Sequence, residues 1–211
     1  MNDGTEVNLC YGWGLRLRAL AQIGLRYARD EFDSNRYGEI HEIATEMMAA
    51  QSELPKEKLV DLFEREEGYA TPKVDVRGVV FEDDKILLVK ERMDGRWSLP
   101  GGWADVGKSM RENVEREICE EAGLETRAVR LLAVYDRAKH GHKPLMPFHV
   151  YKMFVLCEQL GGELQGSCET SEAGFFGENA LPELSIGRVL PEQIKRMFAY
   201  KRKPEMDVYF D

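Results

Sequence analysis

The 211 residues include 38 acidic and 29 basic side chains, which gives a formal net charge of −9. This charge argues against a protein whose main task is to wrap nucleic-acid phosphate or to coat an anionic membrane surface, and it favours a divalent cation as a partner. With 43% hydrophobic and 32% charged residues, the chain can bury a sizeable core in one domain with an appendage or in two small domains.

The cysteine pattern and the first residues indicate the compartment. The four cysteines form no CxxC pair, and MNDGTEVNLC lacks the basic-then-apolar pattern of a signal peptide. The apolar runs are short and interrupted by charge, so none approaches the roughly 20 residues that span a bilayer. We therefore expect a cytoplasmic chain without disulfides or a membrane span.

Helical periodicity dominates the first third of the chain. Residues 11–50 predict two amphipathic helices, with Asp33, Ser34 and Asn35 between them as capping side chains. Each helix carries an apolar stripe, formed by Trp13, Leu17, Leu20, Gly24 and Tyr27 in the first and by Tyr37, Ile40, Ala44 and Met47 in the second. These stripes exceed what a small hairpin of helices can bury, which predicts a homodimer through residues 1–68.

A third helix, KEKLVDLFEREE, should begin after Pro55 and stop at Gly68, where we place a domain boundary. From there KVDVRGVVF (73–81) and KILLVKE (85–91) predict a hairpin of strands. Further strands are expected around 126–135 and 148–157, and a last helix near 191–201 has Pro191 in its first turn. Residues 1–68 are thus expected to form a helical segment, and residues 69–211 an α/β sandwich with a mixed sheet.

The stretch LPGGWADVGKSMRENVEREICEEAGLE (99–125) predicts one well-bounded helix. Ser109 and Glu112 form a capping-box pattern, and Gly123 is suited to the position just after a helix end. The helix should therefore run from about residue 110 to residue 122.

Three glutamates lie along one face of this helix. Glu117, Glu120 and Glu121 stand at positions i, i+3 and i+4, where like charges cost a few tenths of a kcal/mol per pair. Taken alone, the pattern is typical of a solvated acidic face. The alternative is a carboxylate cluster for Mg²⁺ or Mn²⁺, which take oxygen ligands and retain waters and substrate phosphates.

The surrounding spacing favours the metal site. Gly102 and the run REICEEAGL (116–124) match the Nudix box, G-x5-E-x7-R-E-U-x-E-E-x-G-U with U aliphatic, except at one fixed position. Six fixed residues at set spacing should arise by chance on the order of once in a million windows. The chain therefore resembles the Nudix hydrolase family. The resemblance implies an α/β/α sandwich and the hydrolysis of a nucleoside diphosphate linked to another moiety, X.

The resemblance also implies roles for the residues of the box. The three helix glutamates and the Gly102 carbonyl would bind Mg²⁺ or Mn²⁺, which clamps the pyrophosphate and activates the attacking water. Gly101 and Gly102 would let the backbone come close to the metal. Arg116 would hold a carboxylate in its ligating orientation, or it could pair with Glu112 one turn earlier.

Lys108 occupies the position of the first glutamate of the box. This departure puts one loop or metal contact of the family in doubt, while the three helix carboxylates remain. Lys108 could contact a substrate phosphate as a point charge, or it could be an exposed loop lysine.

A further carboxylate is commonly supplied in this family before a late strand that carries an aromatic residue. In CETSEAGFF, Glu169 stands six residues before Phe175 and fits the general base or an extra metal ligand. Glu172 is the competing candidate, and either residue could be an ordinary loop acid.

Several other side chains are candidates for substrate binding. His140 and His142 flank Gly141 in a polar loop and could meet phosphate or the leaving group, although such histidines are often only solvated. Trp103 could stack on a base, cover a choline-like cation or pack in the core. Arg77, in an otherwise apolar strand, is a candidate phosphate contact.

The resemblance covers nearly the whole chain. Together with the box, GYATPKVDVRGVVF, HGHKP, HVYKMFVLCE, ETSEAGFF and LPELS look like the Nudix subgroup that cleaves CDP-choline and is often labelled ADP-ribose pyrophosphatase. CDP-choline, cleaved to CMP and phosphocholine, is therefore the expected substrate, with ADP-ribose as the alternative. The family resemblance also favours a dimer.

Two other functions remain open on this sequence. One is a Nudix-derived sensor that binds nucleotide and passes the signal to a partner through its N-terminal helices. Those helices carry five arginines against eight acids over residues 1–50, which argues against direct DNA binding. The other is an RNA-end hydrolase of the same fold, which would need a basic groove that the sequence does not show.

Overall fold

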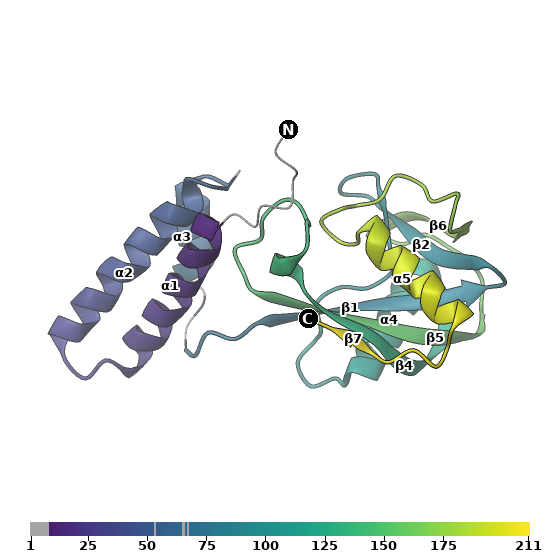
Figure 1. Cartoon of the computed structure of the whole chain (residues 1–211), viewed down its shortest axis with the longest axis horizontal. Coiled ribbons are helices and arrows are strands. Elements are labelled where there is room, and N and C mark those ends of the chain that lie inside the picture. The colour runs from purple at the N-terminus through teal and green to yellow at the C-terminus, as the bar shows by residue number, and fades with distance from the viewer. Residues whose placement is uncertain (1–8, 53, 65, 67) are drawn as a thin grey trace. The chain divides into compact units, whose positions relative to one another are not determined.

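The computed structural model describes residues 9–52, 54–64, 66 and 68–211 (Figure 1). Their contacts divide them into two compact units. The helical unit contains the described residues before Val74 together with Ala138–His149. The sheet unit contains Val74–Arg137 and Val150–Asp211. The contacts therefore divide the chain a few residues after the expected boundary near residue 68, and residues 138–149 return to the helical unit.

The helical unit is built from α1 (Leu9–Tyr27), α2 (Glu31–Ala49) and α3 (Lys56–Glu64). The predicted cap between the first two helices is wrong by three residues. Asp30 is the N-cap of α2, and its side chain accepts a hydrogen bond from the Asp33 backbone N at 2.8 Å. The predicted capping residues 33–35 lie inside α2, because the chain already turns at residues 28–30.

Two glycines bring α1 and α2 into close contact. A Cβ atom on Gly14 would stand 2.8 Å from the Met48 side chain, and one on Gly24 would stand 2.3 Å from the Tyr37 ring. A larger residue at either position would therefore force the neighbouring side chain or the helices to shift. The buried face of α1 that results consists of Tyr11, Gly14, Arg18, Ala21 and Gln22.

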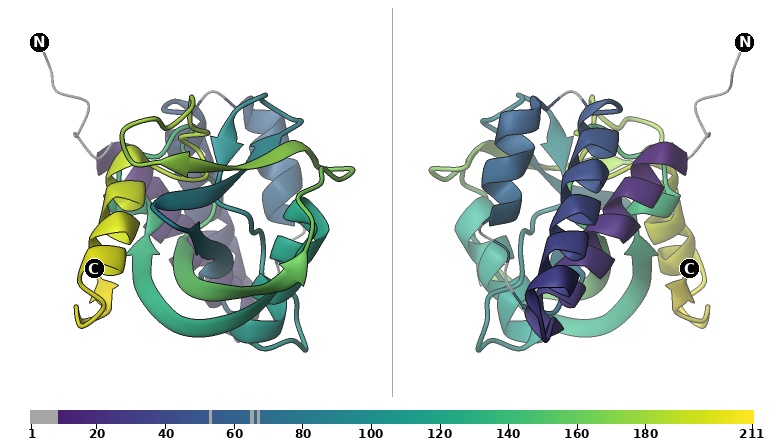
Figure 2. Two further views of the ribbon diagram at one scale, coloured as in Figure 1. Left: turned by 90° about the vertical axis from the view of Figure 1, so that its right-hand side faces the viewer. Right: turned by 90° about the vertical axis from the view of Figure 1, so that its left-hand side faces the viewer.

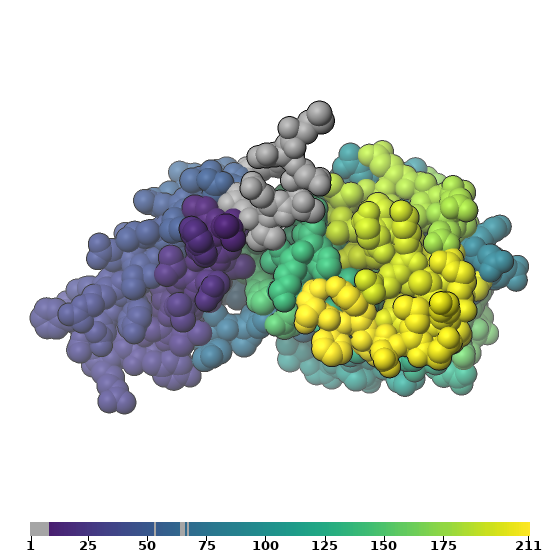
Figure 3. Space-filling model, viewed as in Figure 1, coloured from purple at the N-terminus to yellow at the C-terminus, as the bar shows by residue number. Residues whose placement is uncertain are grey.

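The predicted apolar stripe of α1 lies mainly outside this buried face. Trp13, Leu20 and Tyr27 are 54%, 61% and 65% exposed. They recur every seven residues and so share one side of the helix. Figure 3 shows α1, in purple, at the surface of the helical unit.

Residues 138–149 complete the core of the helical unit. Leu145 and Phe148 pack on a buried cluster that includes Phe63 and Met48. The Phe63 and Phe148 rings meet edge to face, with centroids 6.5 Å apart. This packing explains why the loop belongs to the helices although it lies between two strands in the sequence.

The sheet unit contains a mixed sheet, as predicted. Its strands are β1 (Lys73–Glu82), β2 (Lys85–Glu91), β3 (Trp97–Ser98), β4 (Leu124–Asp136), β5 (Val150–Gly162), β6 (Thr170–Gly177) and β7 (Tyr209–Phe210). Their order is β3-β2-β1-β5-β4-β7, with β6 paired to β2. β7 runs parallel to β4, whereas β1–β2 and β4–β5 are antiparallel. The predicted hairpin is confirmed, with Phe81 opposite Ile86.

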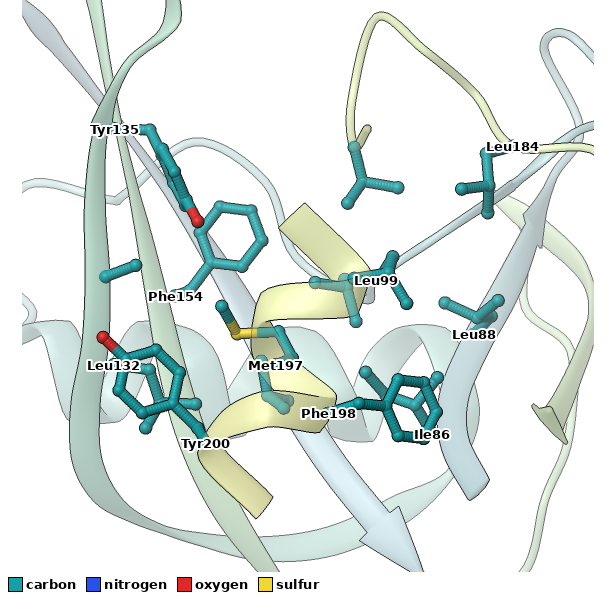
Figure 4. Packing of buried hydrophobic residues seen from close by; sticks show 14 residues of the cluster. Ile86, Leu88, Leu99, Leu132, Tyr135, Phe154, Leu184, Met197, Phe198 and Tyr200 are labelled. Carbon is teal, nitrogen blue, oxygen red and sulfur yellow. The ribbon is translucent and has the colours of Figure 1, made fainter. Parts of the chain in front are cut away.

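Two helices cover the sheet, α4 (Met110–Ala122) and α5 (Pro191–Arg202). Figure 2 (left) shows them on opposite sides of the strands. Because neighbouring residues of a strand face opposite sides, β2 sends Ile86 and Leu88 to the α5 side and Leu87 and Val89 to the α4 side. Figure 4 shows the α5 side, where Met197 contributes to the packed cluster. The α/β sandwich predicted from the sequence is confirmed.

The helices also bear on the question of a membrane span. Among the residues that the structure describes, no helix is both long and apolar enough to cross a bilayer.

Candidate active site

The helix that carries the glutamates is bounded as predicted. The Ser109 hydroxyl accepts a hydrogen bond from the Glu112 backbone N at 3.2 Å, and the Ser109 backbone N donates to the Glu112 carboxylate at 2.7 Å. Gly123 ends the helix with φ +75°, a conformation that favours glycine. Ile118 points to the sheet, close to Gly78 of β1. The helix is therefore fixed at both ends and along its apolar face.

The glycine loop before the helix runs beside β1. The backbone N of Gly78 donates to the Pro100 carbonyl, and that of Val76 donates to the Gly102 carbonyl, each at 2.8 Å. Gly101 has φ +139°, and a Cβ atom there would stand 2.0 Å from the Val76 carbonyl oxygen. Only glycine fits this position without moving the backbone.

Glu121 joins the helix to the glycine loop. Its buried carboxylate accepts a hydrogen bond from the Gly101 backbone N at 2.8 Å. Burial raises the pKa of Glu121 to about 7, although the Arg77 charge and the Gly101 hydrogen bond act in the opposite direction. The structure thus holds a carboxylate in a site where its negative charge is incompletely compensated.

Glu117 lies against the same loop. A Cβ atom on Gly102 would stand 3.4 Å from one of its carboxylate oxygens. Burial raises the pKa of Glu117, while its ion pair with Arg116 at 2.7 Å lowers it. Arg116 also contacts Glu120 at 2.5 Å and Asp105 at 3.1 Å. Arg116 therefore bridges the carboxylates of the site, whereas its alternative partner Glu112 caps the helix.

The donor set suits a hard divalent cation. In the part of the chain that the structure describes, no three carboxylate, imidazole or thiol groups stand close enough to bind a metal ion as they are. Here Arg116 contacts Glu117 and Glu120, and the backbone N of Gly101 donates to Glu121. All three side chains offer oxygen ligands, and the raised pKa values of Glu117 and Glu121 indicate negative charge that a cation would stabilise.

A buried ion cluster that the sequence analysis missed lies under the glycine loop. Arg77 donates two hydrogen bonds to the Asp75 carboxylate, at 2.9 and 2.7 Å, and Lys152 donates a third at 2.6 Å. Burial alone would raise the pKa of Asp75, but the charges of Arg77 and Lys152 hold it at about 2. The local signals were charged residues within apolar strands, Arg77 in KVDVRGVVF and Lys152 in HVYKMFVLC, and neither pattern reveals the partner.

The position of Arg77 bears on its predicted contact with phosphate. The side chain is buried, only 4% exposed, and also donates to the Leu99 carbonyl at 3.1 Å. Its charge acts on Glu121 and on Glu117. These internal partners favour a positioning role for Arg77 over a direct contact with substrate.

A second buried carboxylate was also missed. Glu91 accepts a hydrogen bond from the Ser98 hydroxyl and pairs with the Arg188 guanidinium, each at 2.8 Å. The negative charge of Glu91 contributes to raising the pKa of Glu121. Glu91 ends an apolar strand in the sequence, and nothing local distinguishes it from an ordinary polar strand end.

The two loop glutamates have different surroundings. The Thr170 hydroxyl donates to the Glu121 backbone carbonyl at 2.6 Å, which ties the start of β6 to the last turn of α4. Glu169 directly precedes this contact and is exposed, and the described residues include no ion-pair partner for it. Glu172 pairs with Lys90 at 2.7 Å. This difference favours Glu169 as the available carboxylate.

The remaining candidates are divided between the two units. Trp103 follows the glycine loop and is 45% exposed. Lys108 is exposed, with Asp105 at 3.8 Å. His140 and the buried His142 belong to the helical unit, so their contact with substrate stays a prediction.

Family models match both parts of the chain. Residues 10–63 match a model described as the UDP-X-like Nudix N-terminal oligomerisation domain, and residues 71–197 match the NUDIX domain. The second match alone covers more than half of the chain. The divalent cation that Nudix hydrolases generally use agrees with the oxygen donors of the glutamate site.

Relatives of known name extend along most of the sequence. The Bacillus subtilis (strain 168) protein called "Putative ADP-ribose pyrophosphatase YjhB" is 46% identical over 93% of this chain and 94% of its own length. A crystal structure of an ADP-ribose pyrophosphatase from Streptococcus suis is 44% identical, with a TM-score of 0.61, over 67% of this chain and all of that one. A crystal structure of a UDP-X diphosphatase is 33% identical, with a TM-score of 0.62, over 97% of this chain and 99% of that one.

The family model and the sequence motif point to the same part of the chain. The residues of the box that the sequence analysis singled out lie on α4 and the glycine loop, within the matched NUDIX domain. The chain therefore belongs to the Nudix hydrolase family and is a pyrophosphohydrolase with an N-terminal oligomerisation domain of the UDP-X-like type.

Proposed function

We propose that the preferred substrate is a cytidine diphosphate linked to a small cationic alcohol, with CDP-choline as the first choice. The observation that carries this proposal is the exposed Trp103 indole directly after the glycine loop. A quaternary ammonium group is stabilised by an aromatic face and by nearby negative charge. Asp105, two residues further along the loop, supplies a carboxylate, which also contacts Arg116 at 3.1 Å.

The proposed metal ligands are Glu117, Glu120 and Glu121, with the carbonyl of Gly102 as a backbone donor. A bound Mg²⁺ or Mn²⁺ would neutralise the pyrophosphate oxygens and lower the pKa of a water. The Gly102 carbonyl already accepts the hydrogen bond from Val76, so it would use its second lone pair. Arg116 would orient Glu117 and Glu120, because it contacts both carboxylates.

The proposed general base is Glu169. A base must be free to accept a proton from the attacking water, and the described residues place no cation on this carboxylate. The Thr170 hydroxyl fixes the adjacent backbone to the last turn of α4. Water would then attack one phosphorus in line, and the bond to the bridging oxygen would break. CDP-choline would yield CMP and phosphocholine.

ADP-ribose is the alternative substrate, because the relatives from Bacillus subtilis and Streptococcus suis carry names of that activity. We expect kcat/KM to be higher for CDP-choline than for ADP-ribose or a UDP-sugar when each is assayed with Mg²⁺ and with Mn²⁺ and the products are identified. Trp103→Ala should lower kcat/KM for CDP-choline about tenfold, which is the range of a cation–π contact, and Trp103→Phe should retain most of it. A clear preference for ADP-ribose would overturn the choice of substrate.

We also propose that the chain is a homodimer held by the exposed stripe of α1. The family model describes this region as an oligomerisation domain, and Trp13, Leu20 and Tyr27 leave an apolar side uncovered in one chain. Leu20→Glu should shift the sedimentation of the intact chain to that of a monomer. Leu25→Glu, which lies on another side of α1, is the matched control. A wild-type monomer at micromolar concentration would contradict the proposal.

A further inference from the structure

The helical unit contains a cavity of about 120 Å³ between α1, the segment before β1 and the end of the 138–149 segment. Apolar side chains such as Leu15 and Phe148 form part of its wall. An apolar cavity of roughly 150 Å³ can hold a benzene-sized molecule, so this space suits a small ligand or one end of a larger one. All described lining residues belong to the helical unit, and none of them belongs to α4 or to the glycine loop.

A buried arginine lines this cavity. Arg18 is 5% exposed, and its Nη1 donates to the Gln22 side chain at 3.1 Å. Its guanidinium lies over the Phe63 ring, 4.2 Å from the centroid. The Nε atom is buried and has no hydrogen-bond partner among the described residues. Among the described residues, only one of the five guanidinium N–H donors of Arg18, on Nη1, therefore has a hydrogen-bond acceptor.

The charge of Arg18 is not balanced by a direct ion pair. A buried charge is costly unless it is paired, and among the side chains that the structure describes Arg18 has no ion-pair partner, although the charge of Glu66 opposes the effect of burial on the pKa of Arg18. Glu66, the acidic side chain of the described cavity wall, pairs with Lys73 at 2.7 Å. Arg16 adds another cation to the wall. Three cations thus face one carboxylate that is already engaged.

We propose that this cavity binds a small molecule that carries a phosphate or carboxylate group. The guanidinium of Arg18 would form hydrogen bonds with this group, and Arg16 and Lys73 would add positive charge. The planar guanidinium of arginine forms paired hydrogen bonds with phosphate and with carboxylate alike, so either group suits this site. The apolar part of the wall would contact the remainder of the ligand. The site would give the oligomerisation domain a ligand of its own, separate from pyrophosphate hydrolysis.

The test is calorimetric titration of the full chain with inorganic phosphate, acetate and CMP in the presence of EDTA. The chelator suppresses metal-dependent binding of phosphate at the glutamate site. We expect at least one of these anions to bind one per chain with a Kd below about 1 mM. Comparing phosphate with acetate identifies the oxyanion, and CMP tests whether a larger group is tolerated.

Variants locate the binding. Arg18→Lys keeps the positive charge but loses the paired N–H donors of the guanidinium, and it should weaken anion binding at least tenfold. Arg16→Gln, on the exposed part of the wall, should weaken it several-fold and keeps the test valid if Arg18→Lys does not fold. Arg29→Gln, an exposed arginine of the same unit outside the cavity wall, should bind as the wild type does.

Three results would overturn the proposal. Wild-type protein that binds none of the three anions would exclude a small-anion site. Binding that survives both Arg18→Lys and Arg16→Gln would place the anion elsewhere. Altered sedimentation of Arg18→Lys without anion binding to the wild type would show that an acidic side chain of another copy occupies the cavity.

Discussion

Replacing Glu121 with glutamine should lower kcat by on the order of 10²-fold or more, with the fold intact. The amide oxygen of glutamine can still accept the hydrogen bond from Gly101 that the carboxylate accepts at 2.8 Å. The variant therefore retains the loop contact and loses the negative charge that would hold the metal. Glu120→Gln and Glu117→Gln should have effects of the same order. The measurement is kcat over a titration of Mg²⁺ and Mn²⁺, with circular dichroism to verify folding.

Glu125→Gln is the matched control for the three substitutions. Glu125 is exposed in β4, just beyond the end of α4, and it should keep wild-type turnover. If all three helix variants also keep wild-type turnover at saturating metal, the proposed metal ligands are wrong.

The sequence predicted the parts of the site that depend on local signals. The helix ends follow from Ser109, Glu112 and Gly123, which act within a few residues of each other. The spacing of the box assigned Gly102 and Glu117 to one site, and the Glu117 carboxylate does lie against that glycine. The same kind of signal was misjudged before α2, where several adjacent residues could cap the helix and Asp30 does so.

Contacts between distant residues could not be predicted in this way. Asp75 and Lys152 stand 77 positions apart, and neither the strand pattern nor the charge pattern pairs them. The packing of Leu145 and Phe148 in the helical core could not be predicted either, because a polar loop between two strands predicts only a connection between them. The ion cluster under the glycine loop is thus a tertiary feature, and it changes the interpretation of Arg77.

Replacing Arg77 with methionine should destabilise the sheet unit by about 3–5 kcal/mol, the usual cost of removing one partner from a buried ion pair. Asp75 would keep only Lys152, and the buried Glu121 would lose the nearby positive charge that opposes its raised pKa. The measurement is the free energy of unfolding in urea. Arg127→Met, which breaks the exposed pair with Glu158, should change that free energy little.

Arg77→Lys tests whether Arg77 positions the glycine loop and the carboxylates or contacts a substrate phosphate directly. A lysine keeps the positive charge near Glu121 but cannot reproduce the two-pronged contact with Asp75, so stability should fall less than in Arg77→Met. A positioning residue should lower kcat through the glycine loop and the carboxylates and leave KM nearly unchanged in the folded fraction. A variant of wild-type stability whose KM for the nucleotide rises tenfold would show instead that Arg77 contacts the phosphate directly, and its buried contacts with Asp75 and Leu99 would then have to open when substrate binds.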